Sequence, residues 1–195
     1  SAEDVHTIGE EWTYVSMAMG PFDPDYFPVR EDVTSRLQLN VVNFDGANLQ
    51  DTTFSSCGIP TGLQFVTFKG ADLSRAEFNC AGFNGVDFEG ANLEEAIINN
   101  AYFVCCEHQT IFTGANLTGA HIYSTFMEGA NLRNVNIMDA RIFHSSFADS
   151  TFVDANIDHV SMCCSDFTRA NFRDAIIHSS DVRSTNFSYA NLEGA

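Results

Sequence analysis

Residues 114–133 read GANLTGAHIYSTFMEGANLR, and this stretch contains the pattern that governs most of the chain. A large apolar residue, here called the centre, stands at every fifth position: Leu117, Ile122, Met127 and Leu132. Two positions before each centre stands a small residue: Ala115, Ala120, Thr125 and Ala130. A period of five is neither the 3.6 residues of a helix nor the 2.0 of a strand, so a different regular structure is expected.

The same spacing extends in both directions from this stretch. Centres run from Leu39 to Leu192, with two apparent one-residue slips, one near Pro60 and one between Cys105 and Thr110. Self-similarity at a fixed short period is typical of solenoids, in which each repeat packs on its neighbours. We therefore expect the centre and the small residue before it to point inward, and the other three positions to face solvent.

Four segments carry a more specific signal: 70–74 (GADLS), 90–94 (GANLE), 114–118 (GANLT) and 129–133 (GANLR). They resemble the pentapeptide-repeat family, whose consensus is Ala-Asp/Asn-Leu-x-x, and the resemblance covers most of the chain. It implies an all-β fold, a right-handed quadrilateral parallel β-helix in which four pentapeptides form one coil. Backbone hydrogen bonds would join successive coils at about 4.8 Å.

Assigning successive centres to four faces predicts about eight coils, with the irregular stretch at His108 counted as one repeat. The first predicted stack is Phe54, Leu73, Leu93, Phe112, Leu132, Phe152, Phe172 and Leu192, and the second is Leu39, Ile59, Phe78, Ile98, Leu117, Ile137, Ile157 and Ile177. The third is Phe44, Leu63, Phe83, Phe103, Ile122, Ile142, Met162 and Val182, and the fourth is Leu49, Phe68, Phe88, a gap at His108, Met127, Phe147, Phe167 and Phe187.

Two parts of the chain do not fit the repeat. Residues 1–36 are predicted to form an N-terminal cap, because a solenoid end exposes unpaired backbone and residues 20–28 are rich in turn residues and aromatics. Residues 37–195 are predicted to form the β-helix. Residues 104–110 are predicted to leave the wall as a bulge or loop.

The composition excludes some partners. Nine Lys and Arg residues oppose 26 Asp and Glu residues, which gives a formal net charge of −17. This charge opposes direct binding of nucleic acid, which needs clustered cations, and opposes binding to anionic membranes. With no long apolar run, we expect a soluble chain. We expect a cytoplasmic location, and because the sequence starts at Ser1, an exported or lumenal location after removal of a leader stays open.

Acidic residues gather on the first and fourth predicted faces, whereas the third is close to neutral. This surplus has two interpretations: a solvated surface that keeps a rod soluble, or a strip that imitates the phosphates of duplex DNA. The residues predicted as a candidate interaction surface are Glu89, Glu94, Glu128, Asp149, Asp154, Asp166 and Asp174.

Evidence for catalysis or metal binding is weak. Standard phosphate-loop, hydrolase and zinc motifs are absent from the sequence. One outward column on the third face would contain Cys105, Ser124, His144 and Cys164, with Cys163 and His159 nearby in sequence. Such a cluster could hold zinc or a nucleophile, but four tetrahedral ligands are not evident, so we predict no cofactor, no metal and no enzymatic activity.

The cysteine spacing gives a prediction about redox state. Cys105 and Cys164 would lie three coils apart, beyond the Cα separation of about 7 Å that a disulfide tolerates. Cys57 is expected to face inward, and Cys80 is expected on another face. No pair is evident, so free thiols are expected, and these favour a reducing compartment.

Two functions remain open. The first is a rigid, non-enzymatic scaffold or module that binds another protein, whose identity the sequence does not give. The second comes from the resemblance: the best-understood family members resemble B-form DNA in shape and charge and shield DNA gyrase from quinolones, which implies an acidic DNA mimic that binds gyrase or topoisomerase. An end-to-end homodimer is also left open.

Overall fold

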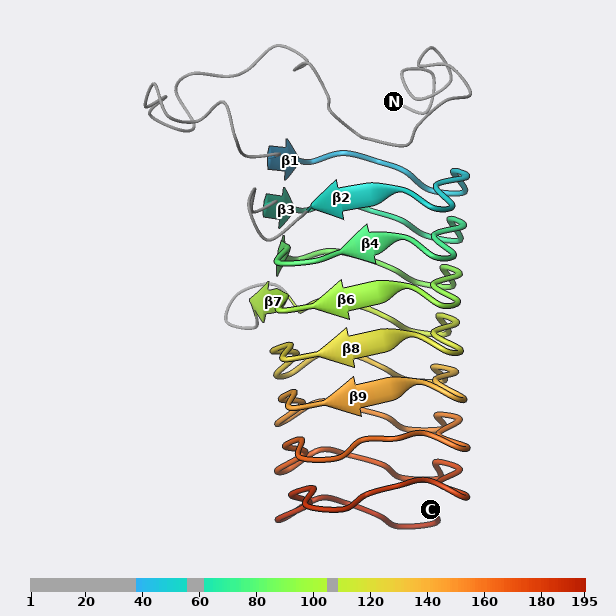
Figure 1. Cartoon of the computed structure of the whole chain (residues 1–195), viewed down its shortest axis with the longest axis vertical. Coiled ribbons are helices and arrows are strands. Elements are labelled where there is room, and N and C mark those ends of the chain that lie inside the picture. Colours follow the sequence, from blue (N-terminus) through green and yellow to red (C-terminus); the bar gives the residue numbers. More distant parts are fainter. Residues whose placement is uncertain (1–37, 56–61, 105–108) are drawn as a thin grey trace.

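Short parallel strands at the same position of successive coils make up the regular structure (Figure 1). The computed structural model describes residues 38–55, 62–104 and 109–195. The nine strands of these residues are β1 (Gln38–Asn40), β2 (Thr53–Ser55), β3 (Gly62–Gln64), β4 (Glu77–Phe78), β5 (Gly82–Asn84), β6 (Ile97–Asn99), β7 (Tyr102–Val104), β8 (His121–Tyr123) and β9 (Arg141–Phe143). The chain is thus an all-β solenoid with no helix in the described residues, and it winds in a right-handed sense in Figure 1. The predicted cap, residues 1–36, lies outside them.

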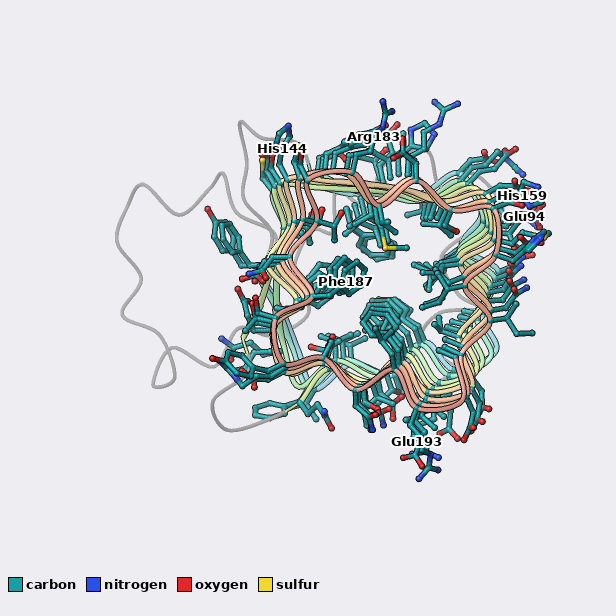
Figure 2. All side chains as sticks on the ribbon, turned by 90° about the horizontal axis from the view of Figure 1, so that it is seen from below. Glu94, His144, His159, Arg183, Phe187 and Glu193 are labelled. Atoms are coloured by element: carbon teal, nitrogen blue, oxygen red, sulfur yellow. The ribbon has the colours of Figure 1, made fainter. Side chains whose placement is uncertain are left out.

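Four ladders of parallel pairs define four faces of the solenoid. Face A contains the bridged residues Asn43, Thr67, Asp87, Ile111, Asn131, Thr151, Asn171 and Asn191. Face B contains Asn48, Asp72, Asn92, Asn116, Asn136, Asn156 and Ile176. Face C is the sheet β2-β4-β6-β8-β9, continued by Ser161 and Asp181, and face D is the sheet β1-β3-β5-β7, continued by Phe126, Ser146, Asp166 and Asn186. Figure 2, which looks along the solenoid axis, shows the resulting square outline.

The pairing corrects the predicted stacks in the N-terminal half. Asn48 pairs with Asp72 and Asn92 pairs with Asn116, each 24 residues away, whereas Asn116 pairs with Asn136, 20 residues away. Two coils therefore contain four extra residues each, between the centres Phe54 and Leu63 and between Phe103 and Phe112. In a repeat of five, an insertion of four is indistinguishable from a slip of one, so Ile59 and His108 were wrongly counted as centres; both lie outside the described residues.

The corrected stacks keep the predicted inward positions. Face A stacks Phe44, Phe68, Phe88, Phe112, Leu132, Phe152, Phe172 and Leu192; face B stacks Leu49, Leu73, Leu93, Leu117, Ile137, Ile157 and Ile177. Face C stacks Phe54, Phe78, Ile98, Ile122, Ile142, Met162 and Val182; face D stacks Leu63, Phe83, Phe103, Met127, Phe147, Phe167 and Phe187. The stack of face A agrees with the first predicted stack from Phe112 onward. Before Phe112 the two stacks contain different residues.

Stacked rings fill the interior. On face A, the ring centroids of Phe68 and Phe88 are 5.1 Å apart and those of Phe88 and Phe112 are 4.8 Å apart, with planes 8° from parallel in both pairs. Phe147 and Phe167 on face D stack in the same way at 5.1 Å. These distances follow from the spacing of neighbouring strands, because each ring lies directly over the ring of the next coil.

Small inward residues leave room for these rings, and their polar members are hydrogen-bonded except at Thr110, whose buried hydroxyl has no partner among the described residues. Ala76, Ala96 and Ala120 are fully buried. The hydroxyl of buried Thr125 donates to the Ile98 carbonyl at 2.8 Å, and that of Ser145 donates to the Ile122 carbonyl at 3.3 Å. Ser and Thr are therefore tolerated inside, because a buried hydroxyl carries little penalty once it is hydrogen-bonded.

The corners need an unusual backbone conformation. The residue two positions after each centre has a positive φ, between 51° and 75°, wherever that residue is described. Most of these residues are not glycine, and His144, Cys164 and Asp149 are examples. The left-handed conformation costs about 1–2 kcal/mol for an ordinary residue, so packing and coil-to-coil hydrogen bonds must over-determine the corner. Outward corner side chains are therefore held in fixed columns.

Removing an inward ring is expected to destabilise the whole rod. Phe147→Ala should lower the free energy of unfolding by about 3 to 5 kcal/mol, because it leaves a cavity between stacked neighbours. Ala130→Leu should cost about 1 to 3 kcal/mol by overpacking the coil. Denaturant titrations of both variants measure these losses. Tyr189→Ala is the matched control, since the Tyr189 side chain is 89% exposed, and a comparable loss there would contradict the account of the core.

Candidate interaction surfaces

The residues predicted as an acidic strip lie on three faces. Glu89 lies on face A, with Asp154 and Asp174 at the corner that follows it, and Glu94 lies on face B. The remaining three belong to face D or to its corner with face A: Glu128, Asp149 and Asp166. Figure 2 shows Glu94 and Glu193 at separate places on the outline. The structure therefore does not bring these residues together as one strip, because the two four-residue insertions rotate the N-terminal residues to other faces.

Cations interrupt the acidic columns. Lys69 Nζ lies 2.8 Å from an Asp87 carboxylate oxygen and 2.9 Å from a Glu89 oxygen, and these contacts raise the pKa of Lys69. Arg75 donates to both carboxylate oxygens of Asp51, at 2.7 and 2.8 Å, and this hydrogen bonding lowers the pKa of Asp51.

The same pairing occurs further along the rod. Arg169 donates to both oxygens of Asp149, one coil away, at 2.6 and 2.5 Å, and this hydrogen bonding lowers the pKa of Asp149. Arg173 lies 3.1 Å from Asp174, and Arg133 lies 3.8 Å from Asp154. Of the seven predicted residues, Glu94, Glu128 and Asp166 form no ion pair with another described residue. The surface around the seven predicted residues is therefore less negative than the sequence suggested.

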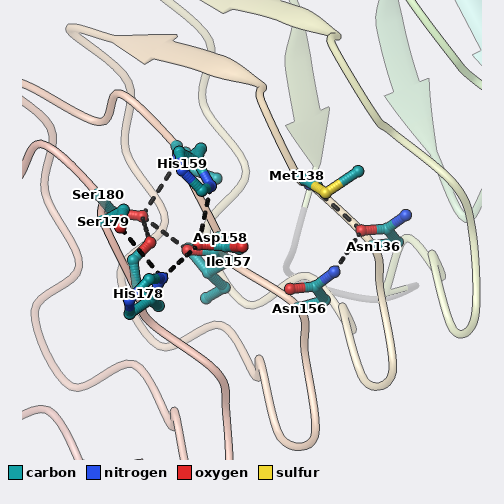
Figure 3. A network of polar contacts seen from close by, with 10 residues as sticks. Asn136, Met138, Asn156, Ile157, Asp158, His159, His178, Ser179 and Ser180 are labelled. Carbon is teal, nitrogen blue, oxygen red and sulfur yellow. Dashed lines mark hydrogen bonds and ion pairs between the residues drawn. The ribbon is translucent and has the colours of Figure 1, made fainter.

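Face B carries a ladder of side-chain amides. The Asn116 amide donates to Asn92 Oδ1 at 3.0 Å, the Asn136 amide to Asn116 Oδ1 at 3.3 Å, and the Asn156 amide to Asn136 Oδ1 at 3.0 Å. The same oxygens accept backbone N–H groups, as Asn136 Oδ1 does from Met138 at 3.3 Å (Figure 3). A side-chain amide has both donor and acceptor atoms, so each Asn donates to one coil and accepts from another, which accounts for Asn one position before these centres. Sequence reasoning missed this ladder, although the recurring Asn was its signal.

A histidine–aspartate cluster lies on the same face, near the C-terminal end of the rod (Figure 3). Asp158 Oδ1 lies 3.0 Å from Nδ1 of both His159 and His178. Partial burial raises the pKa of Asp158, but the hydrogen bond with His178 and the interaction with His159 outweigh it, and the net shift is downward. Asp158 thus links two successive coils electrostatically.

This cluster does not have the geometry of a hydrolase triad. Ser179 Oγ lies 3.0 Å from His178 Nδ1, which is the nitrogen that also contacts Asp158. In a Ser-His-Asp triad the serine and the aspartate contact opposite ring nitrogens, so that the imidazole takes the serine proton on one nitrogen while the aspartate holds the N–H of the other. The arrangement around His178 therefore gives no activated serine.

The predicted thiol–imidazole column is present in part. Ser124, His144 and Cys164 follow successive centres of face C, and His144 lies at the corner between faces C and D in Figure 2. Cys105 lies outside the described residues, and its centre, Phe103, belongs to face D instead. Among residues 38–55, 62–104 and 109–195, no group of three or more His, Cys, Asp or Glu residues could hold a metal ion.

The cysteines differ from the prediction of free thiols. Cys163 and Cys164 are free, as predicted. Cys80 is disulfide-bonded, which the prediction did not include. Its partner lies outside the described residues. The disulfide removes the argument for a reducing compartment.

The corner between faces B and C has a shallow groove, which runs beside Gly119 and is lined by Asp51, Arg75, Glu77, Glu95, Ile97, His121, Asp139 and Arg141. The groove is open and its charges are mixed, unlike the concave and mainly apolar pockets that bind small molecules. The described residues also contain no helix long and apolar enough to cross a membrane.

Two family profiles match the sequence. The profile described as Pentapeptide repeats (9 copies) matches residues 66–104, and the profile described as Pentapeptide repeats (8 copies) matches residues 110–149, 150–188 and 165–195. No curated protein sequence matches the chain.

Comparison with solved structures gives several matches. A trypsin-treated variant of QnrB1, a plasmid-mediated fluoroquinolone resistance protein, is 16% identical with a TM-score of 0.56, and the match covers 77% of this chain and 82% of that chain. HetL, a pentapeptide-repeat protein involved in regulating heterocyst differentiation in the cyanobacterium Nostoc, is 20% identical with a TM-score of 0.36, covering 80% and 86%. Rfr23 from the cyanobacterium Cyanothece is 16% identical with a TM-score of 0.21, covering 79% and 90%. At these identities, the similarity to QnrB1 shows the fold alone.

The ion pair between Asp149 and Arg169 predicts a pH-dependent contribution to stability. The pKa of Asp149 is lower in the folded chain than the value of about 3.9 for an unfolded Asp. The ion pair therefore stabilises the folded chain at pH values above the unfolded pKa of Asp149, and this stabilisation is lost as the pH falls through the folded pKa. Asp149→Asn should melt at a lower temperature than the parent at pH 7, and the difference should shrink below about pH 4. A difference that persists undiminished at pH 2 would contradict this origin.

Alkylation should separate the cysteines. Iodoacetamide reacts with thiols and not with disulfides, so the native chain without reductant should be modified at the exposed Cys164 and not at Cys80. After reduction, Cys80 should be modified as well. Peptide mass spectrometry reads out both states, and modification of Cys80 before reduction would show that the disulfide is absent.

Proposed function

Because the chain belongs to the pentapeptide-repeat family, we propose that it is a non-enzymatic scaffold that binds another protein through its flat faces. The observation that supports this proposal most directly is the filled interior. The buried centres stack along the described coils, and the groove at the corner between faces B and C is open and lined by mixed charges. A rod of this kind offers rigid columns of outward side chains, and such columns suit recognition of an extended surface better than enclosure of a small substrate.

The groups with nucleophilic or acid–base chemistry add little support for an enzyme. His178 contacts serine and aspartate through one nitrogen, and Cys163 and Cys164 lie on an open wall. Catalysis requires donors fixed around a reacting atom and protected from water. Neither cluster provides that enclosure, so a binding function accounts for the surface better.

Mimicry of DNA is the second candidate. The carboxylates in excess on faces A, B and D favour it, since a row of negative charges can replace phosphates for a DNA-binding enzyme. The ion pairs of Lys69, Arg75 and Arg169 weigh against it, because they neutralise carboxylates one coil away in the same rows. The scaffold proposal is therefore preferred.

A binding experiment with a matched variant tests the scaffold proposal. The folded chain is used as bait, a protein that it captures is purified, and the affinity of the pair is measured. A quadruple variant, Cys163→Ser, Cys164→Ser, His178→Ala and Ser179→Ala, should bind that protein with unchanged affinity, because faces rather than reactive groups make the contact. Backbone amides of the rod should gain hydrogen-exchange protection along one face. Loss of binding in the quadruple variant, together with turnover of the captured protein by the parent, would indicate an enzyme instead.

A supercoiling assay tests the mimicry candidate. DNA gyrase at low salt should be unaffected by micromolar rod, and Glu94→Lys with Glu128→Lys should change nothing. Inhibition by the parent that weakens with added salt and disappears in the double variant would favour mimicry, since contacts that replace phosphates weaken as ionic strength rises.

A further inference from the structure

Two stacks of aromatic rings point outward on either side of the corner between faces C and D. Tyr102 and Phe126, on face D, stack at 5.3 Å with planes 8° from parallel, and their side chains are 58% and 44% exposed. Tyr123 and Phe143, on β8 and β9, stack at 5.4 Å with planes 4° from parallel. In the core, stacked rings are explained by burial, but these rings face solvent, so packing of the core does not account for them.

Arg141, which lies near Phe143 on β9, forms no ion pair with another described residue. Among the Lys and Arg residues that the structure describes, Arg141 alone forms no ion pair, whereas the other cations each contact a carboxylate. In its own column the neighbours of Arg141 are His121 and Ser161, and neither carries a negative charge. Arg141 lies two residues before Phe143 on the same side of β9 and is exposed.

We infer that these side chains form a docking surface for a protein segment that presents an apolar or aromatic side chain next to one or two carboxylates. This surface, the aromatic–arginine ridge, consists of Tyr102, His121, Tyr123, Phe126, Arg141 and Phe143. The inference rests on the proposed scaffold function and specifies its surface. Aromatic residues and Arg are enriched at the centres of protein interfaces and Lys, Asp and Glu are depleted there, which matches this composition.

The shape of the ridge favours an aromatic or aliphatic side chain of the partner. In the column of face D, Gly82 precedes Tyr102 and Ser146 follows Phe126. Both neighbours are small, so they leave one face of each ring uncovered and leave space beside it in the column. A ring or branched side chain of the partner, placed over Gly82 or Ser146, would extend the stack at the same spacing and bury the exposed ring face.

The charge around the ridge limits the number of carboxylates in the partner. The guanidinium of Arg141 can donate to both oxygens of a partner's carboxylate, because no described side chain accepts from it. Glu95 and Asp139 line the groove that Arg141 also lines, and the net charge is −17. A long acidic run would be repelled over about 8 Å at physiological salt, so the segment should be mainly apolar.

A second copy of the chain fits less well. In a two-fold contact of this ridge with itself, each side would bring the same unpaired Arg141 and no carboxylate from the ridge. A contact of the ridge with an acidic face of another copy would not close and would build an open chain. The partner is therefore a different protein.

Selection of peptides on the intact chain tests the inference. Random dodecapeptides displayed on phage are selected on the immobilised parent, and enriched sequences are synthesised and titrated by fluorescence anisotropy. The enriched peptides should combine Phe, Trp, Leu or Ile with one or two Asp or Glu residues. Arg141→Gln, and separately Tyr102→Ser with Phe126→Ser, should weaken their Kd about tenfold or more, as expected for the centre of an interface.

Controls separate this inference from the scaffold proposal. Arg169→Gln removes a cation that is already paired with Asp149 and should leave the Kd unchanged, and unchanged melting temperatures verify that the ridge variants fold. Peptides that bind the ridge variants as tightly as the parent would overturn the inference and leave a rod that binds protein elsewhere. Failure to find any peptide with a Kd below about 1 mM, together with no captured protein, would overturn both. Sedimentation showing a dimer that the ring variants abolish would assign the ridge to a second copy and also overturn it.

Discussion

Parallel backbone hydrogen bonding between successive coils is the interaction on which the rest of the structure depends. The Leu117 N–H donates to the Asn136 carbonyl at 2.7 Å, and the Asn136 N–H donates to the Ala115 carbonyl at 3.0 Å. Repeated on four faces, these bonds fix each residue directly above its counterpart in the next coil. The stacked core rings, the left-handed corners and the asparagine ladder all follow, because each needs its neighbour at the spacing of adjacent strands, about 4.8 Å.

The inward and outward positions could be predicted from the sequence because they depend only on the local period. Phe147 and Ala130 are buried where the repeat places them, and most outward positions follow in the same way. The assignment of centres to faces depends on the exact length of every coil. Each four-residue insertion looks like a slip of one in a period of five, so Asp51 was assigned to the wrong face and its bidentate contact with Arg75 was not foreseen. The stack of Tyr102 on Phe126, 24 residues apart, was missed for the same reason.

The alignment of residues from coil to coil also explains why a net charge of −17 does not produce a continuous negative strip. Charged residues in one column stand one coil apart, close enough for Arg169 to reach Asp149 and for Lys69 to reach Glu89. Exposed pairs of this kind stabilise a protein by little, but they fix side-chain orientation and cancel local field. The fold thus converts a sequence-wide surplus of acid into a surface on which paired and unpaired charges alternate, and only the column positions reveal which are which.

Outward positions of this fold accept many residue types. Whether an outward charged residue forms an ion pair within the rod therefore helps to distinguish a structural residue from a functional one. A cation with a carboxylate one coil away has a sufficient role in the rod itself, as Arg75 has with Asp51. Arg141 has His121 and Ser161 above and below it, and the rod gives it no such role. The outward rings differ from the core rings in the same respect, since burial within the chain does not account for Tyr102 at 58% exposure. Arg141 stands two residues from Phe143 on β9, so these two unexplained features of different chemistry are neighbours on face C, and a partner that supplies both a carboxylate and an apolar group would account for them together.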